Sequence, residues 1–575
     1  MESLSRLVKV ASGKSRGDLL LKNCKIVNVF SSKIEEGDVL ISDRKIAGVG
    51  VYERKHAHQL IDIKGAYVAP GLIDAHVHIE SAMVSPFEFA KAIVPLGTTS
   101  VIVDPHEIAN VLGQDGIKFM LESSKNNHIS FYFMLPSCVP ATHLETSGST
   151  LLAKDLEPFI DEPWVRGIGE VMNFPAVIGA HHDILKKVLI GKQKRVDGHA
   201  PGVSGHALNA YVAAGILSDH ECVTTAEARE KLARGMKILI REGSCAKNLE
   251  TLLPLVEEKN CARFSFCTDD RLPEDLVARE HINYCVKRAV KLGLDPVMAI
   301  KMATINTAEH YKIERKGAVV PGYWADLIVF DNFKNFNIQK VFRSGQVVAL
   351  DFKFTAKSRK RKTSPIRGTV NVGHFSEQKL KIKEVKHKAL RVIKLIKNQL
   401  LTEEMQYRPR CFDAARNILS DVEHDILKIA VVERHLASGH VGVGFVHGFG
   451  LKQGAIASTV AHDSHNIIII GTNDGDMEIA VKSLIESQGG EIVVLDGKVK
   501  ALLPLPIAGL MSKKSVQEVN KQKQKLLLEA RKQGVRLENP FITMSFLSLP
   551  VIPKLKLTDR GLVDVLQFDF TSLFV

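Results

Sequence analysis

The chain has few cysteines and no long apolar run, and both absences limit what it can be. Eight cysteines are scattered over 575 residues and none forms a Cys-x-x-Cys pair, which argues against a disulfide framework or a zinc knuckle. No segment approaches the roughly 18 consecutive apolar residues of a membrane span. Residues 1–18 are polar and basic, with an apolar patch too short for the core of a signal peptide. These features predict a cytoplasmic protein with no membrane partner.

The net charge of +13 raises the alternative of a nucleic-acid partner. Much of the excess lies in residues 353–367, which read KFTAKSRKRKTSPIR. Nucleic-acid binding needs a basic face interleaved with stacking aromatic side chains, and only Phe352 and Phe354 lie near this run. Because runs of like charge usually stay solvated, we interpret residues 353–374 as a basic linker and expect no nucleic-acid partner.

Length and periodicity divide the chain into several parts. A single core stops growing at about 250–300 residues, so a chain of this length implies more than one domain. Alternating strand patterns over 1–65 and 317–352 predict one small β domain built from both segments. Between them, residues 66–316 alternate strand and helix patterns over about the length of a TIM-type (β/α)8 barrel. Residues 375–575 mix both patterns and predict an α+β domain.

Some individual elements can be assigned from their hydrophobic period. In the barrel we expect helices over residues 279–292 and 296–309. In the last third we expect strands over 427–433 and 466–471, and helices over 375–398, 477–487 and 515–533.

Two histidines at the end of an apolar run are the strongest functional signal. The run reads Gly-Ala-Tyr-Val-Ala-Pro-Gly-Leu-Ile-Asp-Ala-His-Val-His and ends in His76 and His78. In an extended strand, residues i and i+2 point to the same face, so the two imidazoles converge. They form either half of a metal site or a pair of hydrogen-bonded core histidines, and the motif alone does not separate these alternatives.

Four more polar residues favour the metal site. Glu170, His199, His220 and Asp269 each follow a short apolar or β-branched stretch. In a barrel of parallel strands, residues from the ends of several strands meet on one face. Four histidines, one glutamate and one aspartate suffice for two divalent metals with the glutamate bridging them. Such ligands suit manganese or iron as readily as zinc.

The same segments carry a resemblance that extends over nearly the whole chain. The sequence resembles the bacterial and archaeal adenine deaminases of the metal-dependent amidohydrolase superfamily, with Ala82 where that family usually has serine. The resemblance implies the barrel, the β domain built from its two flanks, and the C-terminal domain. The matching segments are residues 70–83, 98–111, 169–175, 197–205, 215–221, 266–271, 454–467, 471–477, 503–511 and 543–561.

The resemblance implies hydrolytic deamination of adenine to hypoxanthine and ammonia, in purine salvage. A hydroxide shared by the two metals would attack C6 of the purine. The first metal would be held by His76, His78 and Asp269. The second would be held by His199 and His220, and the glutamate would bridge both. The expected cofactors are two divalent ions, Mn²⁺ or Fe²⁺, with Zn²⁺ as the alternative.

The reaction also needs groups that transfer protons. Asp269, beside the hydroxide, is the expected proton shuttle, and Asp270 would bind substrate or orient its neighbour. His106 and Glu107 lie in the Asp-Pro-His-Glu loop after the second barrel strand. They are candidates for binding the purine ring and relaying protons, and the alternative is a role in capping a helix.

Other interpretations stay open. The ligands alone would suit another cyclic amide or amidine hydrolase of the superfamily, such as a hydantoinase. A non-catalytic relative would have lost a ligand, and all six are present. From spacing, His462, Asp463 and His465 look like polar turn residues, whereas the resemblance implies a role near the active-site mouth of the same or a neighbouring subunit. The resemblance also implies a homodimer or larger homo-oligomer.

Overall fold

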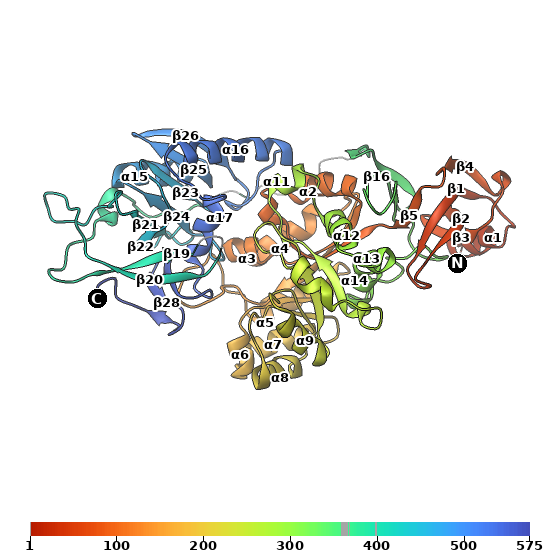
Figure 1. The fold of residues 1–575 in the computed structure, drawn as a ribbon, viewed down its shortest axis with the longest axis horizontal. Helices are drawn as coiled ribbons and strands as arrows, with labels where there is room; N and C mark the ends of the chain where they lie inside the picture. Colours follow the sequence, from red (N-terminus) through yellow and green to blue (C-terminus); the bar gives the residue numbers. More distant parts are fainter. Residues whose placement is uncertain (1, 358–365, 367, 397–398) are drawn as a thin grey trace.

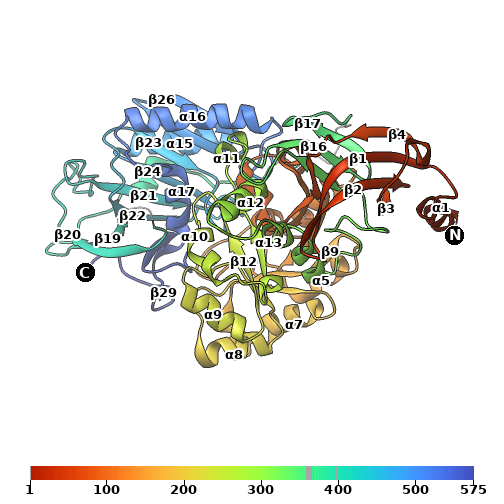
Figure 2. The same ribbon diagram turned by 45° about the vertical axis from the view of Figure 1, so that its right-hand side comes forward.

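Three groups of strands follow one another along the long axis of the molecule (Figure 1). The computed structural model describes residues 2–357, 366, 368–396 and 399–575, so most basic residues of the expected linker lie outside the described residues. The N-terminal and C-terminal sheets lie at opposite ends, and the barrel and its helices lie between them, also in the turned view of Figure 2. Within the described ranges, no helix combines the length and apolar character needed to cross a bilayer.

The first sheet draws its strands from both flanks of the barrel. β5 (Tyr67–Pro70) pairs in parallel with β1 (Gly17–Asn28) and antiparallel with β15 (Leu327–Phe330). The strand order is β18-β17-β16-β15-β5-β1-β2-β3, and β4 pairs with β1. The sheet therefore extends to residues 70 and 354. Its other strands are β2 (Lys33–Ser42), β3 (Lys45–Gly50), β4 (Ala57–Asp62), β16 (Ile338–Arg343), β17 (Gln346–Leu350) and β18 (Lys353–Phe354), and helix α1 (Glu2–Ala11) packs beside them.

The middle of the chain forms a barrel of parallel strands. Six strands follow the order β10-β9-β8-β7-β6-β14, and three follow the order β11-β12-β13. The two sets meet where the Leu217 amide donates to the Val196 carbonyl at 3.1 Å, and where β14 continues β13. The predicted barrel class is confirmed. The strands are β6 (Leu72–His78), β7 (Thr98–Val103), β8 (Ser130–Pro136), β9 (Val165–Val171), β10 (Val196–Gly198), β11 (Ser218–Asp219), β12 (Lys237–Arg241), β13 (Phe264–Cys267) and β14 (Asp269–Asp270).

Helices cover the outside of the barrel, so its strands are buried on both faces. Every residue of β6, β7 and β8 is buried. The helices are α2 (Pro86–Ile93), α3 (His106–Leu112), α4 (Gln114–Ser123), α5 (Ala153–Ile160), α6 (Phe174–Ile178), α7 (His182–Gly191), α8 (Gly205–Ala213), α9 (Thr225–Ala233), α10 (Leu249–Leu252), α11 (Pro273–Val277), α12 (Ile282–Lys291), α13 (Pro296–Met302) and α14 (Ile305–His310).

One predicted barrel helix is two helices. The expected helix over 279–292 is α12, but the expected helix over 296–309 is divided into α13 and α14. The division has a tertiary cause, because the Ala303 carbonyl accepts the Ile73 amide of β6 at 2.8 Å. Because this carbonyl accepts a hydrogen bond from a barrel strand, the regular hydrogen-bond pattern of a single helix is interrupted at Ala303.

The last third forms an eight-stranded sheet with helices packed against it. Its order is β20-β19-β22-β21-β24-β23-β25-β26. The expected strands over 427–433 and 466–471 are β21 (Ile426–Val432) and β24 (Ile467–Gly471). The helices expected over 477–487 and 515–533 are α15 (Asp474–Glu486) and α16 (Val516–Lys532). The other elements are β19 (Leu390–Leu395), β20 (Thr402–Tyr407), β22 (Val441–His447), β23 (Ala455–Ser458), β25 (Gly490–Leu495), β26 (Lys498–Pro504), α17 (Pro540–Ser545), and a small sheet of β27 (Leu555–Thr558), β28 (Gly561–Asp564) and β29 (Asp569–Phe570).

The helix predicted over residues 375–398 is wrong. Among its described residues, 375–396, helical structure is limited to a 3₁₀ turn at Glu377–Leu380, and β19 occupies Leu390–Leu395. β19 pairs antiparallel with β20 and in parallel with β22. Leu390, Val392 and Ile393 are fully buried in this sheet, so tertiary pairing and burial override the helical spacing of the lysines.

A buried ion cluster joins the first sheet to the barrel. Asp326 precedes β15, and its carboxylate contacts Lys316 Nζ and accepts a 2.7 Å bond from Arg343 Nη1. Arg343 Nη2 also donates to Ser130 Oγ of β8 at 2.7 Å. Burial opposes ionisation of Asp326, but Lys316 and Arg343 lower its pKa to about 2. The aspartate is therefore the negative charge that compensates the buried Lys316 and the half-buried Arg343.

We expect Asp326→Asn to lower stability strongly, because it leaves Lys316 and Arg343 without their carboxylate. Removing one partner of a buried ion pair costs about 3–5 kcal/mol, which corresponds to a fall in melting temperature on the order of 10 °C. Thermal unfolding followed by circular dichroism measures the change. The matched control is Asp43→Asn. Asp43 pairs with Arg6, which is 47% exposed, so we expect this variant to change the free energy of unfolding by no more than about 1 kcal/mol. Equal melting temperatures for both variants would contradict the role of the cluster.

Candidate metal centre and active site

The two histidines of β6 point to one position at the carboxyl end of the barrel. The Nε2 atoms of His76 and His78 are 3.1 Å apart, and both residues are buried. His78 Nδ1 lies 2.9 Å from the Asp104 carbonyl, which can only accept a hydrogen bond. That bond places a proton on Nδ1 and directs Nε2 into the site, the arrangement that orients a metal-binding histidine.

Glu170 lies between two groups of imidazoles. On one side, its Oε1 is 3.3 Å from His78 Nε2 and 3.8 Å from His76 Nε2. On the other, its Oε2 is 2.7 Å from His199 Nδ1 and 3.1 Å from His220 Nε2. The two oxygens of one carboxylate thus face different histidine pairs, as a bridging ligand requires.

A close approach of the backbone fixes the position of Glu170. Its amide donates to Asp104 Oδ2 at 2.8 Å. At the preceding residue, Gly169, a Cβ atom would lie only 2.4 Å from the same oxygen. Glycine is therefore favoured there, because a side chain would collide with the carboxylate that accepts the Glu170 amide and, at 2.5 Å, with Met134 Cβ.

Asp269 completes the group around the first histidine pair. Its Oδ1 is 3.1 Å from His78 Nε2 and 3.5 Å from His76 Nε2. Its Oδ2 accepts a 2.8 Å hydrogen bond from Arg241 Nη1. Burial opposes ionisation of this carboxyl, but Arg241 and the histidines hold its pKa well below the usual range. Asp269 is therefore an anion with one oxygen fixed by arginine and the other facing the site.

These side chains form electron-rich groups that suit a cation. His78 Nε2 faces two carboxylate oxygens, so either a proton or a metal ion must lie among them. Glu170 also has a pKa well below its usual range, because His220 and His199 outweigh its burial. Ionised carboxylates and imidazoles match the preferences of Mn²⁺, Fe²⁺ and Zn²⁺. The ligand atoms lie within 4.8 Å of one another in each of these sets: His76, His78, Asp269; His76, Glu170, His220; and His199, His220, Glu221.

Two charged residues of the site were missed in the sequence. Glu221 Oε1 is 3.4 Å from His220 Nε2 and 3.6 Å from His199 Nδ1. Arg241 contacts the carboxylates of both Glu221 and Asp269. Arg241 ends the buried strand β12, so the strand-end argument that selects the histidines could have found it. Glu221 directly follows a candidate ligand, and its spacing carries no separate signal.

The loop after β7 contributes the next pair of candidates. His106 Nδ1 is 3.4 Å from Glu170 Oε1, and His106 Nε2 is 3.3 Å from Glu107 Oε1. Both residues begin α3 and are buried. Asp270, the neighbour of Asp269, accepts a 2.5 Å hydrogen bond from Ser81 Oγ. All nine predicted site residues therefore lie at this end of the barrel.

The histidines of the last third also reach the site. His462, Asp463 and His465 lie between β23 and β24 and are no more than 6% exposed. His462 Nδ1 is 2.9 Å from Glu107 Oε1, and His465 Nε2 contacts Glu107 Oε2. These residues do occupy a turn, but the interpretation of them as ordinary turn residues is wrong, because the turn is buried against the barrel of the same chain.

Comparison with known proteins assigns this geometry to a family. A model of the amidohydrolase family matches residues 67–348, and a model of the adenine deaminase C-terminal domain matches residues 399–569. A curated adenine deaminase of Kosmotoga olearia is 47% identical over 574 residues, covering 99% of this chain and 98% of that protein. The curated adenine deaminase 2 of Carboxydothermus hydrogenoformans is 49% identical and covers 99% of each chain. The chain belongs to the adenine deaminase family.

Among solved structures, the chain matches an enamidase described as a member of the amidohydrolase superfamily. It is 19% identical, covers 60% of this chain and 97% of its own, and has a TM-score of 0.46. Amidohydrolases generally use a divalent metal centre, and the buried histidine and carboxylate clusters of this adenine deaminase family member fit one.

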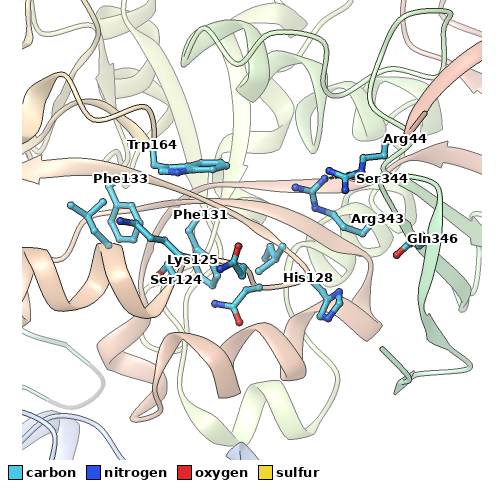
Figure 3. Close-up of a pocket in the computed structure, with 14 residues that line it drawn as sticks. Arg44, Ser124, Lys125, His128, Phe131, Phe133, Trp164, Arg343, Ser344 and Gln346 are labelled. Carbon is cyan, nitrogen blue, oxygen red and sulfur yellow. Dashed lines mark hydrogen bonds between the residues drawn. The ribbon is translucent and has the colours of Figure 1, made fainter. Parts of the chain in front are cut away.

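A separate cavity of about 380 Å³ lies at the amino-terminal end of the barrel. Figure 3 shows the Trp164 ring on one side of it and the side chains of Arg44 and Arg343 on another. The described residues that line it include none of the predicted site residues. The cavity is therefore distinct from the cluster at the carboxyl ends of the strands.

We expect Glu170→Gln to remove at least half of the metal that the wild-type protein retains after manganese loading and gel filtration. The amide keeps the shape of the side chain but loses the negative charge that faces both histidine pairs. Metal content is measured by inductively coupled plasma mass spectrometry. Glu157→Gln, on the exposed face of α5, is the matched control. Wild-type metal content in Glu170→Gln would exclude this carboxylate as a ligand.

Proposed function

We propose that this chain hydrolyses adenine to hypoxanthine and ammonia. The observation that carries the proposal is the carboxylate of Glu170, buried between two histidine pairs in a chain similar over its full length to curated adenine deaminases. The proposed site comprises two divalent ions, Mn²⁺ or Fe²⁺ with Zn²⁺ as the alternative. Their ligands would be His76, His78, Glu170, His199, His220 and Asp269. When bound, such an ion lowers the pKa of water toward about 7 and so makes a nucleophile available at neutral pH.

Asp269 is the proposed proton carrier. Deamination replaces the exocyclic amine of C6 by oxygen, so the attacking water must lose a proton and the departing amine must gain one. The Oδ1 atom of Asp269 faces the site, whereas Oδ2 is held by Arg241. A carboxylate oxygen that faces the site next to the reacting atoms suits transfer of this proton from water to the purine. Asp270, fixed by Ser81, is proposed to bind substrate or orient its neighbour.

His106 and Glu107 are the proposed groups for holding the purine ring. His106 lies beside Glu170, and Glu107 is a buried anion with a pKa held well below its usual range. Burial opposes its ionisation, but His462 and His465 outweigh the effect. A fixed carboxylate accepts a hydrogen bond from an N–H group of adenine, which would orient the ring for attack at C6.

We also propose the wider organisation expected of such an enzyme. Residues 1–65 with 317–352 would form the β domain, whose sheet is extended to residues 70 and 354 by β5 and β18. The rest of 66–316 would form the barrel, the rest of 353–374 the linker, and 375–575 the C-terminal domain. The enzyme would be a cytoplasmic homodimer or larger homo-oligomer.

We expect the manganese-loaded protein to convert adenine to hypoxanthine and release one ammonia per turnover. Absorbance spectroscopy and an ammonia assay measure the two products. Adenosine, cytosine and dihydroorotate are run in parallel, and we expect turnover of adenine alone, which Glu170→Gln should abolish. Activity only on another cyclic amide or amidine would be compatible with the proposed metal site but would refute adenine as the substrate.

We expect Asp269→Asn to lower kcat for adenine by about 10²–10⁴-fold, the usual contribution of a positioned acid–base group. The amide keeps the side-chain volume but cannot accept and release a proton at neutral pH. Steady-state kinetics at matched metal occupancy measure the loss. Asp161→Asn, at the exposed end of α5, is the control variant. A kcat within twofold of the wild type would assign the proton transfer to another residue.

A further inference from the structure

The loop that carries His462 and His465, here the 461–466 loop, is held rigidly against the barrel. The buried Arg434 donates through Nε to the His465 carbonyl, and Asn466 Oδ1 accepts the Arg434 amide at 3.2 Å. Asn466 Nδ2 donates to the carbonyl of Thr146, in the barrel loop after β8, at 2.8 Å. The loop is therefore fixed to both parts of the chain at once.

The hydrogen bonds of His465 define which of its ring nitrogens carries the proton. The Ala461 amide lies 3.2 Å from His465 Nδ1, and an amide N–H can only donate. Nδ1 is therefore the acceptor, and the proton of the neutral ring lies on Nε2. Nε2 contacts Glu107 Oε2, so the ring nitrogen that carries the proton is the one that faces this carboxylate.

The same bonds argue against a third metal among these side chains. Glu107, His462 and His465 have ligand atoms within 4.8 Å of one another. A metal on His465 Nε2 would need the lone pair of that nitrogen and would shift the proton to Nδ1. The Ala461 N–H would then face another N–H, so the loop geometry favours a hydrogen-bond donor over a metal ligand.

His462 holds the second oxygen of the same carboxylate. Its Nδ1 is 2.9 Å from Glu107 Oε1. Its ring stacks on Phe546, with centroids 4.5 Å apart and planes 19° apart, and its carbonyl accepts Ser548 Oγ at 3.3 Å. Phe546 and Ser548 belong to the 3₁₀ turn that follows α17, so the C-terminal part of the chain fixes this ring as well.

We propose that His462 and His465 are positioning residues for Glu107, so that the C-terminal part of the chain completes the active site of the barrel. Each imidazole takes one oxygen of the carboxylate, which fixes its rotation and the direction of its remaining lone pairs. The inference rests on the proposed function, in which Glu107 holds the purine ring. Neither histidine contacts a proposed metal ligand among the described residues.

Two pairs of variants test the role of each imidazole. His465→Gln places an amide N–H near the position of Nε2, and His462→Asn places one near that of Nδ1. His465→Leu and His462→Leu remove the donors. We expect each leucine variant to lower kcat/KM for adenine by about 10- to 100-fold, which corresponds to the loss of a hydrogen bond to a charged group. The amide variants should have kcat/KM values between those of the leucine variants and the wild type. The metal content should stay at the wild-type value.

A double-mutant cycle separates positioning from general stabilisation of the fold. In a Glu107→Gln background, His465→Leu should cost less than about twofold, because the group it positions is already altered. His435→Leu is the matched control, since His435 Nε2 bonds the Ser464 carbonyl of the same loop and does not contact Glu107. The change in kcat/KM caused by His435→Leu should be the same in the wild type and in the Glu107→Gln background.

The outcomes are distinguishable. Equal losses from His465→Leu with and without Glu107→Gln would refute the positioning role, as would loss of metal in the leucine variants. Failure of the metal-loaded wild type to turn over adenine would refute the proposed function, and with it this inference. If the wild type turns over adenine and the His465→Leu and His462→Leu variants are equally active, the positioning role is refuted and the proposed function is not.

Discussion

Glu170 is a carboxylate buried at the centre of the protein, where an uncompensated charge would be strongly unfavourable. Its two oxygens face different histidine pairs, so the ligand positions on four strands depend on where this one side chain lies. Asp104 fixes it through the Glu170 amide and also orients His78 through its carbonyl. Gly169 permits that approach, because a Cβ there would collide with Asp104. A short hydrogen-bonded unit at the ends of β7 and β9 thus sets the geometry of both halves of the proposed centre.

The active site is assembled from two distant parts of the chain. The barrel supplies the proposed metal ligands from the ends of its strands, where parallel strands bring their chemistry together. The C-terminal sheet supplies the loop whose histidines contact Glu107. Because Arg434 and Asn466 fix this loop to both parts, the position of Glu107 depends on docking of the C-terminal sheet against the barrel. A barrel without that sheet would retain its ligands and lose the support of the carboxylate proposed to hold the substrate.

Local sequence rules predicted the parts of the site that strands create. His76 and His78 follow from the two-residue period of a strand, and the other proposed ligands follow from polar residues at strand ends. Contacts between remote segments could not be predicted in this way. Nothing near His465 indicates that it contacts Glu107, which lies more than 350 residues earlier in the chain.

The secondary-structure errors have the same origin. The segment predicted as a helix over 375–398 contains β19 instead, because Val392 and its neighbours pair with β20 on one side and β22 on the other. The helix predicted over 296–309 divides where the Ala303 carbonyl bonds a barrel strand. In both segments a long-range hydrogen bond outweighs a local periodic pattern, and periodicity carries no information about such bonds.

Anomalous X-ray diffraction from crystals of the manganese-loaded protein tests directly whether Glu170 bridges two metal ions. We expect two anomalous peaks about 3.5–4 Å apart, as in other two-metal sites, one on each side of the Glu170 carboxylate. One peak should lie among His76, His78 and Asp269, and the other beside His199 and His220. A single peak, or two peaks that do not share Glu170, would contradict the bridging role on which the proposed chemistry depends.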